Sequence, residues 1–400
     1  MSLQATQSGE RVHIAFFGKR NAGKSSVVNA ITGQALSVVS DVKGTTTDPV
    51  KKAMELLPLG PVVIIDTPGF DDEGVLGELR VQKTQEILAK ADVAILISDA
   101  QYELDAVETE FINEIKDKKL PYIIVHNKCD LLSDIPPADR HNIWVSAKQN
   151  TNITELKQMI AAIAKNNTNS KKLVGDLIEK QDIVVLVTPI DESAPKGRLI
   201  LPQQQTIRDI LDTGCTSVVC QPEQLSDTLC ILSRKPKIVI TDSQAFGRVS
   251  KLVPDDIPLT SFSILFARYK GELEVLVQGA AMLSKLKDGD KILISEGCTH
   301  HRQCGDIGTV KLPKWIKDFS GSNIQFDFTS GGEFPKDLSA YKLIVHCGGC
   351  MLNEAEMKHR ISMAKAANVP IVNYGVAIAH INGILKRSLG LFPDITKLLP

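Results

Sequence analysis

The feature that most restricts the fold of this chain is the octapeptide GKRNAGKS at residues 18–25. It matches the pattern G-x-x-x-x-G-K-[ST], and it stands between an apolar run and a stretch with helical spacing. A strand, a tight loop and a helix in this order bring successive backbone N–H groups around a bound phosphate. By itself the pattern also fits a glycine-rich turn with an exposed lysine. Other motifs in the chain are needed to distinguish a phosphate-binding loop from such a turn.

Five apolar runs between residues 11 and 164 end in small or polar residues, and most precede a plausible helix. This alternation is typical of a parallel sheet with helices on both faces, which is an α/β fold. The runs are VHIAFFG (12–18), PVVIID (61–66), DVAILISDA (92–100), YIIVHNK (122–128) and NIWVSA (142–147).

Further motifs stand in order near the ends of these runs. DTPG at 66–69 would place a carboxylate near Mg²⁺ and a glycine N–H near a γ-phosphate. In NKCD at 127–130 the final carboxylate accepts from both the ring N–H and the exocyclic amine of guanine, which adenine cannot match. SAK at 146–148 would lie behind the guanine base. Thr46, in GTTT at 44–47, would supply a hydroxyl to the metal. Together the motifs predict a P-loop GTPase domain.

This prediction gives a role to each motif residue. Catalysis is assigned to Lys24, Thr46, Asp66 and Gly69, and Mg²⁺ binding to Ser25, Thr46 and Asp66. The nucleotide-binding residues are Gly18, Asn21, Ala22, Gly23, Lys24, Ser25, Ser26, Asn127, Lys128, Asp130, Ser146, Ala147 and Lys148.

Over about residues 10–164 the motif set resembles the TrmE–Era-type GTPases of the translation-factor class. The resemblance implies that Asn21 and the loop 39–44 hold a potassium ion that stimulates hydrolysis of GTP. Phe70 follows the DTPG motif, where a glutamine could have oriented the attacking water. We therefore expect slow hydrolysis that a cation or a partner stimulates.

After residue 164 the strand–helix alternation restarts twice, which predicts two further α/β domains with largely parallel sheets. The expected division is a GTPase domain at 1–164, a polar linker at 165–182, a domain at 183–264 and a last domain at 265–400. The domain at 183–264 carries no recognisable catalytic motif, which makes it a candidate for a dimer interface.

Composition excludes some functions. The formal net charge of the 400 residues is −1, whereas contacts to nucleic-acid phosphates need clusters of Lys and Arg. The N-terminus lacks an apolar signal segment, and no apolar stretch reaches membrane-spanning length. We therefore expect a cytoplasmic protein that binds neither nucleic acid nor membrane. Its eight cysteines are then not expected to form disulfides, and where they cluster they indicate catalysis or metal. Three of them lie beside apolar residues and are expected in the core: Cys215, Cys220 and Cys230.

Cysteine and histidine follow two apolar runs near the C-terminus. Cys298 and His300 come after KILIS, and the sequence HCGGC at 346–350 comes after KLIV. Parallel sheets form ligand sites beyond the carboxyl ends of their strands, so the two groups would meet if the strands are neighbours. The glycines would allow a turn that aims N–H groups at sulfur, and the helical stretch after Cys350 would favour thiolate through its dipole.

Several kinds of site fit these residues. Cys347 and Cys350 alone could form a redox dithiol, which leaves Cys298 and His300 unexplained. Purely structural thiols are a second possibility, and zinc held by three cysteines and a histidine is a third. We favour the fourth, an iron–sulfur cluster on Cys298, Cys347 and Cys350 whose fourth iron has an exchangeable or histidine ligand.

The GTPase motifs, the motif-poor middle and the two C-terminal groups together resemble the HydF family of FeFe-hydrogenase maturation GTPases, over nearly all of residues 10–400. The resemblance implies a homodimer that binds a 4Fe–4S cluster through Cys298, Cys347 and Cys350, with His300 and His346 in its vicinity. It also implies that the protein assembles a diiron subcluster precursor with two radical-SAM maturases and delivers it to apo-hydrogenase. The alternative function is a ribosome- or tRNA-associated GTPase with a structural zinc site.

Overall fold

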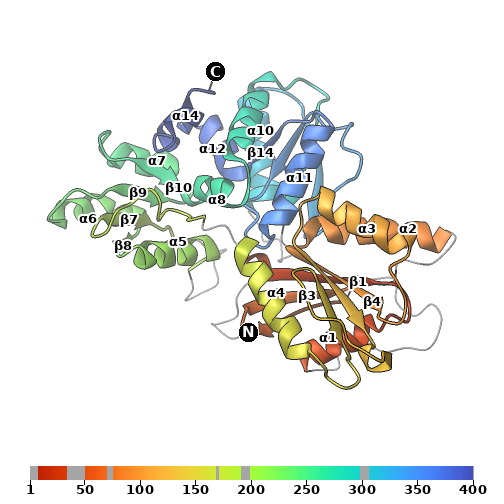
Figure 1. Ribbon diagram of the computed structural model, residues 1–400. Coiled ribbons are helices and arrows are strands. Elements are labelled where there is room, and N and C mark those ends of the chain that lie inside the picture. Colours follow the sequence, from red (N-terminus) through yellow and green to blue (C-terminus); the bar gives the residue numbers. More distant parts are fainter. Residues whose placement is uncertain are drawn as a thin grey trace. The chain divides into compact units, whose positions relative to one another are not determined.

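A computed structural model of the chain describes residues 8–33, 50–69, 75–167, 171–190, 199–297 and 306–399. The chain forms two compact units, Met1–Ser170 and Lys171–Pro400, and each unit is described by itself (Figure 1).

Unit 1, Met1–Ser170, is built on a six-stranded sheet with the strand order β2-β3-β1-β4-β5-β6. The edge strand β2 is antiparallel to β3, and the other pairs in this sheet are parallel. The strands are β1 (Val12–Gly18), β2 (Val50–Leu56), β3 (Gly60–Asp66), β4 (Val93–Asp99), β5 (Tyr122–Asn127) and β6 (Asn142–Val145). The helices are α1 (Lys24–Thr32), α2 (Val75–Lys90), α3 (Ala106–Asp117) and α4 (Ile153–Asn167).

Side chains of β1 alternate between two cores, one on each face of this sheet. Ile14 and Phe16 pack in a cluster with side chains of α1 and α4, whereas Ala15 and Phe17 pack with side chains of α2 and α3. All four are fully buried, and Figure 1 shows the helices on the two sides of the sheet. This arrangement confirms the predicted α/β fold with helices on both faces. The sequence did not predict β2, because its residues VKKAMEL contain no apolar run.

Unit 2, Lys171–Pro400, contains two four-stranded parallel sheets, with the orders β10-β9-β7-β8 and β12-β11-β13-β14. The first sheet has β7 (Ile183–Val187), β8 (Thr216–Cys220), β9 (Ile238–Thr241) and β10 (Leu259–Ser261). The second has β11 (Lys291–Glu296), β12 (Gln325–Ser330), β13 (Leu343–His346) and β14 (Ile371–Asn373). The helices are α5 (Leu201–Asp212), α6 (Leu225–Ile231), α7 (Phe246–Leu252), α8 (Phe262–Lys270), α9 (Leu273–Ala280), α10 (Leu312–Ser320), α11 (Glu354–Ala366), α12 (Tyr374–Ile381), α13 (Leu385–Ser388) and α14 (Pro393–Thr396).

One hydrophobic core joins the two sheets of unit 2. It contains Leu186 of β7, Leu265 of α8 and Ile294 of β11, all fully buried. Val174, from the stretch expected to be a polar linker, belongs to the same core. Its backbone N–H donates to a carboxylate oxygen of Asp209 at 2.7 Å. The middle and C-terminal parts of the chain therefore pack as one body, and residues near 174 are part of it.

Unit 2 differs from expectation in a few elements. The helix α10 and the short strand β10 were not predicted, and α9 continues into a 3₁₀ turn at Ala281–Lys285. Cys215 and Cys220 are buried as predicted, but Cys230 is exposed, so its predicted place in the core is wrong. Among the described residues, no helix combines the length and the apolar character needed to cross a membrane.

The close approach of α9 to β14 gives a test of this packing. A Cβ on Gly279 would lie 2.0 Å from the carbonyl oxygen of Ile371, so Gly279→Ala must displace backbone. We expect the free energy of unfolding of unit 2 to fall by about 1–3 kcal/mol, measured by urea denaturation. The matched control is Gly247→Ala in α7, where a Cβ meets no atom within 4 Å. This variant should be neutral or stabilising by up to about 1 kcal/mol. Equal effects of the two substitutions would contradict the packing described here.

Candidate functional site

The GKRNAGKS loop connects β1 to α1 in the manner that its motif predicts. Gly23 stands just before α1 in the left-handed conformation, with φ 85°. A Cβ there would lie 2.2 Å from the side-chain nitrogen of Asn127. Glycine is therefore required for two reasons, the backbone angle and the space taken by a residue of another motif.

Lys24, Ser25 and Asp66 meet at the carboxyl ends of β1 and β3. The Lys24 ammonium donates to one oxygen of the Asp66 carboxylate at 2.6 Å, and the Ser25 hydroxyl donates to the other at 3.3 Å. Asp66 itself is buried. Thr67, the next residue, donates from its hydroxyl to the carbonyl oxygen of Phe16 at 2.7 Å, which ties DTPG to β1. The predicted metal-binding hydroxyl and carboxylate therefore lie within one hydrogen bond of each other.

Asn127 links three of the predicted motifs. Its side-chain amide donates to the carbonyl oxygen of Ala22 at 3.0 Å, and its side-chain oxygen accepts from the N–H of Ala147 at 3.1 Å. Asn127 is buried, so these contacts replace its hydrogen bonds with water. The asparagine of NKCD thus holds the phosphate loop and the SAK turn against each other.

The remaining GTPase residues lie around this junction. Ser146 is fully buried and its hydroxyl accepts from the N–H of Gln149 at 3.1 Å, whereas Asn21 and Lys148 are exposed. Lys128 forms an ion pair with Asp99 at the end of β4, with 2.6 Å between nitrogen and oxygen. Sequence reasoning missed Asp99, although a polar residue at the end of a buried strand was a signal for it. Thr46, the loop 39–44 and Phe70 lie outside the described residues.

In the second sheet of unit 2, β11 and β13 are parallel neighbours, which is the condition that a shared cysteine site requires. Ser295 lies opposite His346, and the N–H of Cys347 donates to the carbonyl oxygen of Ser295 at 2.9 Å. β12 pairs with the other edge of β11. The chain therefore passes from β11 to β12 on one side and then to β13 on the other side of β11. Such a reversal of strand order opens a crevice at the carboxyl ends of the strands.

The Cys347 thiol accepts backbone hydrogen bonds from both strand ends. The N–H of Gly297 lies 3.0 Å from its sulfur, and the N–H of Gly349 lies 3.4 Å from it. Gly349 was expected to aim its N–H at sulfur, and it does. Gly297 was not foreseen, yet it directly precedes Cys298 in the sequence. Backbone donors of this kind stabilise a thiolate.

Cys298 and His300 lie outside the described residues. Within the described ranges, no group of three or more His, Cys, Asp or Glu side chains is arranged to hold a metal ion. Cys347 and Cys350, both half-buried, are the described members of the predicted cysteine set.

The turn after Cys350 differs from expectation. α11 begins at Glu354, and Asn353 caps it by accepting from the N–H of Glu356 at 3.0 Å. Cys350 therefore lies four residues before the first helical residue, and the expectation that both thiols sit at a helix N-terminus is wrong. The helix dipole acts mainly within the first turn of a helix. At Cys347 the backbone N–H groups of Gly297 and Gly349 therefore stabilise a thiolate in place of the dipole.

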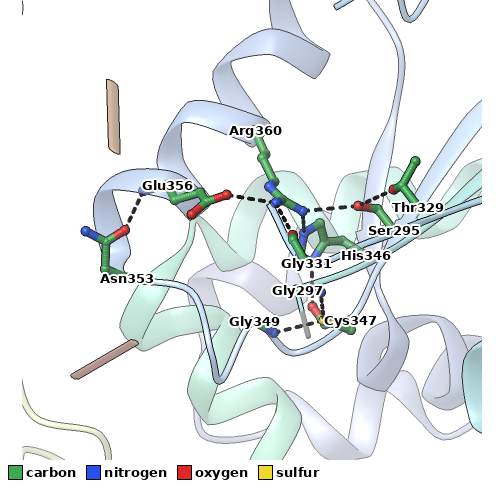
Figure 2. A network of polar contacts seen from close by, with 10 residues as sticks. All are labelled: Ser295, Gly297, Thr329, Gly331, His346, Cys347, Gly349, Asn353, Glu356 and Arg360. Atoms are coloured by element: carbon green, nitrogen blue, oxygen red, sulfur yellow. Dashed lines mark hydrogen bonds and ion pairs between the residues drawn. The ribbon is translucent and has the colours of Figure 1, made fainter. Parts of the chain in front are cut away.

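His346 is fully buried and both of its ring nitrogens are engaged (Figure 2). Nδ1 lies 2.7 Å from the carbonyl oxygen of Cys347, and Nε2 lies 3.0 Å from Nη1 of Arg360. A carbonyl only accepts and a guanidinium only donates, so the proton is on Nδ1 and the Nε2 lone pair accepts from Arg360. In this structure neither nitrogen is available to a metal, although His346 stays in the vicinity of the two cysteines.

Arg360 of α11 is the centre of this network. It is fully buried and contacts Glu356 and the carbonyl oxygen of Gly331, each at 2.8 Å, and the Ser295 hydroxyl at 3.2 Å. Figure 2 shows it reaching from the helix toward the ends of β11 and β13. No sequence pattern pointed to Arg360, because Ser295, Gly331 and His346, which it contacts, come from three separate segments.

The surroundings of Cys350 oppose its ionisation overall. Burial raises the pKa of the Cys350 thiol, the neighbouring Cys347 raises it further, and the ammonium of Lys270 lowers it. Lys270 is buried and donates to the carbonyl oxygen of Cys350 at 3.2 Å. A buried thiol of this kind becomes a thiolate when a metal replaces its proton.

The two glycines of HCGGC should differ in their tolerance of a side chain. Gly349 has φ 64°, and a Cβ there would lie 2.6 Å from the sulfur of Met357, whereas a Cβ on Gly348 meets no atom within 4 Å. We expect Gly349→Ala to lower the free energy of unfolding by about 1–2 kcal/mol, the cost of a left-handed alanine. Gly348→Ala is the control and should change it little. Thermal unfolding of the two variants makes the comparison, and a larger loss in Gly348→Ala would refute the turn geometry.

Comparison with known proteins extends these observations. The curated relatives include the tRNA modification GTPase MnmE of Endomicrobium trichonymphae, 35% identical over 166 residues, or 38% of this chain and 35% of that protein. GTPase Der of Mycoplasmopsis pulmonis is 38% identical over 136 residues, or 33% and 31% of the two chains. The chain thus spans between about a third and just under a half of the length of the curated relatives it matches.

The solved structures that match the chain include Aquifex aeolicus Era bound to GDP·AlF4⁻, with a TM-score of 0.35 and 20% identity over 60% of this chain and 97% of that one. A probable GTP-binding protein engB has a TM-score of 0.30 and 25% identity over 39% of this chain and 99% of that one.

Three family models match the chain in succession. A model described as a 50S ribosome-binding GTPase matches residues 13–128. The hydrogen maturase F dimerization domain matches residues 173–271, and the hydrogen maturase F tetramerization domain matches residues 274–391. The last two adjoin and together span more than half of the 400 residues. The chain therefore belongs to the hydrogen maturase F family, with a GTPase domain preceding the two maturase domains.

Proposed function

We propose that this protein is a GTP-hydrolysing scaffold that binds a 4Fe–4S cluster and assembles and delivers the diiron precursor of FeFe-hydrogenase. The GTPase part rests on the family matches and on the convergence of Lys24, Ser25 and Asp66. The observation that carries the cluster part is the contact between Gly297 N–H and the Cys347 sulfur, 3.0 Å apart. This contact joins the two strand ends that carry the predicted thiols.

In the GTPase domain, Lys24 would neutralise the β- and γ-phosphates once it leaves Asp66, and the N–H of Gly69 would contact the γ-phosphate. The fit to Mg²⁺ is supported by the 3.3 Å contact between the Ser25 hydroxyl and the Asp66 carboxylate, because a hydroxyl and a carboxylate that close suit one coordination shell. Thr46 would complete this set. Asn21, which is exposed at the phosphate loop, would bind the stimulating potassium ion.

Guanine would be recognised by Asp130, with the junction of Asn127 and Ala147 behind it. Lys128 adopts the left-handed conformation with φ 67°, which turns the chain sharply between Asn127 and Asp130. Ser146 and Lys148 would line the opposite side of the base.

The cluster would be held by Cys298, Cys347 and Cys350, with His300 nearby. Two features of the structure fit such a group: the half-buried position of Cys347 and Cys350, and the backbone N–H groups aimed at the Cys347 sulfur. A cluster with three cysteine ligands offers an iron with an exchangeable position, which is suited to holding a ligand or cargo. The chain's own contribution is to fix the two strand ends and to shield the sulfurs from water.

The dimerization and tetramerization domains support self-association of the chain. We propose that it functions as a homodimer or a higher assembly, that two radical-SAM maturases supply the diiron precursor, and that apo-hydrogenase receives it. The maturase domains and the net charge of −1 favour this function over a ribosome- or tRNA-associated GTPase with a structural zinc.

Nucleotide specificity tests the GTPase part. Asp130→Asn removes the carboxylate that accepts from guanine and offers an amide that suits the 2-oxo group of xanthine. We expect affinity for GDP to fall on the order of a hundredfold and affinity for xanthosine diphosphate to rise, since two hydrogen bonds to a charged group are lost. Equilibrium binding of the two nucleotides measures the change. Asp134→Asn, at an exposed aspartate in the following loop, should leave both affinities unchanged, and an unaltered preference in Asp130→Asn would refute the assignment.

Metal analysis and the visible spectrum of anaerobically purified protein test the cluster part. About four irons per chain and a brown colour are expected, and Cys298→Ala should abolish both while GTP hydrolysis persists. Cys230→Ala, at an exposed cysteine, is the control and should retain the iron. A colourless protein with one zinc per chain would favour the ribosome-associated alternative, and an iron-free protein indifferent to Cys298→Ala would favour a dithiol of Cys347 and Cys350.

A further inference from the structure

Lys270 is a buried lysine at the cysteine turn that no sequence motif includes. It is the last residue of α8 and is 3% exposed. Its ammonium donates to the carbonyl oxygens of Gly349 at 3.3 Å, Cys350 at 3.2 Å and Leu352 at 2.9 Å. An ammonium group has three N–H donors, so a single cation engages three carbonyls of one turn.

These contacts fix the turn from a distant part of the chain. Lys270 precedes its three partners by 79, 80 and 82 residues. It extends from a helix anchored in the core, since Phe266 of α8 is almost fully buried and its ring centroid lies 5.9 Å from the Lys270 nitrogen. The carbonyls of successive residues repel one another when they face the same point, and a cation at that point removes the repulsion. The conformation of the turn between the two cysteines therefore depends on Lys270.

The charge of Lys270 also acts on the thiols. The Lys270 ammonium lies beside the turn that carries both thiols, because it donates to the backbone carbonyls of Gly349 and Cys350. Thiolates that bind iron add negative charge there, and reduction of a cluster adds one more.

We infer that Lys270 is a positioning residue that holds the Cys347–Cys350 turn in its ligating shape and stabilises the negative charge of a bound iron–sulfur cluster. The inference rests on the proposed cluster-binding function. The two cysteines and two glycines form the turn, whereas Lys270 shapes the turn without binding the metal.

The test compares full-length wild type with Lys270→Met, Lys270→Arg and the control Lys314→Met, at an exposed lysine of α10. Each protein is reconstituted anaerobically with ferrous iron and sulfide. Lys270→Met should lose iron to a chelator roughly tenfold faster or more, the effect of one hydrogen bond to a charged group. It should also have a lower midpoint potential, because a nearby cation favours the reduced cluster. Lys270→Arg keeps the charge and should keep a potential near that of wild type, and Lys314→Met should match wild type in both.

The outcomes distinguish this inference from the function on which it rests. A wild-type protein that takes up no cluster overturns the proposed function. A wild type with a cluster, beside a Lys270→Met variant with the same chelation rate and potential, overturns only the role of Lys270. Thermal unfolding of the metal-free proteins tests whether Lys270 is instead needed for folding in general. If both Lys270 variants lose cooperative unfolding, Lys270 has a general structural role and the inference is overturned as well.

Discussion

The parallel pairing of β11 with β13 is the constraint on which the cysteine site depends. Because the strands run side by side in the same direction, residues that follow each of them emerge at the same edge of the sheet. The register places Ser295 opposite His346, and the next residues along bring Gly297 to the Cys347 sulfur. β12 pairs with the opposite side of β11, so the strand order reverses between β11 and β13. A shift of one residue in the register would turn the strand side chains to opposite faces and separate these contacts.

The same rule organises the GTPase domain. β1 lies between β3 and β4, so the phosphate loop, DTPG and the residues after β4 share one edge. In both units, buried polar side chains then connect the loops: Asn127 in unit 1, and Arg360 with Lys270 in unit 2. A buried charge costs free energy unless it is paired or hydrogen-bonded. The presence of such side chains at these loops therefore favours loop conformations that offer acceptors to the buried donors.

Much of this fold was predictable because a strand in the middle of a parallel sheet is apolar on both faces. The runs VHIAFFG and KLIVH predict buried strands for that reason. The edge strand β2 is exposed over most of its length and contains no apolar run, so it was not predicted, and neither was the three-residue strand β10. α11 begins where the N-cap pattern Asn353-x-x-Glu356 in the sequence indicates, and only the expectation that the two thiols lie at its N-terminus was wrong. Cys230 sits among apolar neighbours in sequence but is exposed in space, because a short helix turns one face outward.

The sequence alone determined the α/β class, the order of the GTPase motifs and the two cysteine-bearing strand ends, since each is written in local patterns of apolar runs and turn residues. Only the tertiary structure decided that β11 and β13 are neighbours, that His346 donates to a carbonyl and accepts from Arg360, and that Lys270 reaches the turn. These are contacts between segments far apart in the chain, with up to 82 residues between donor and acceptor. No local pattern encodes them, because they depend on how helices and sheets pack around one core.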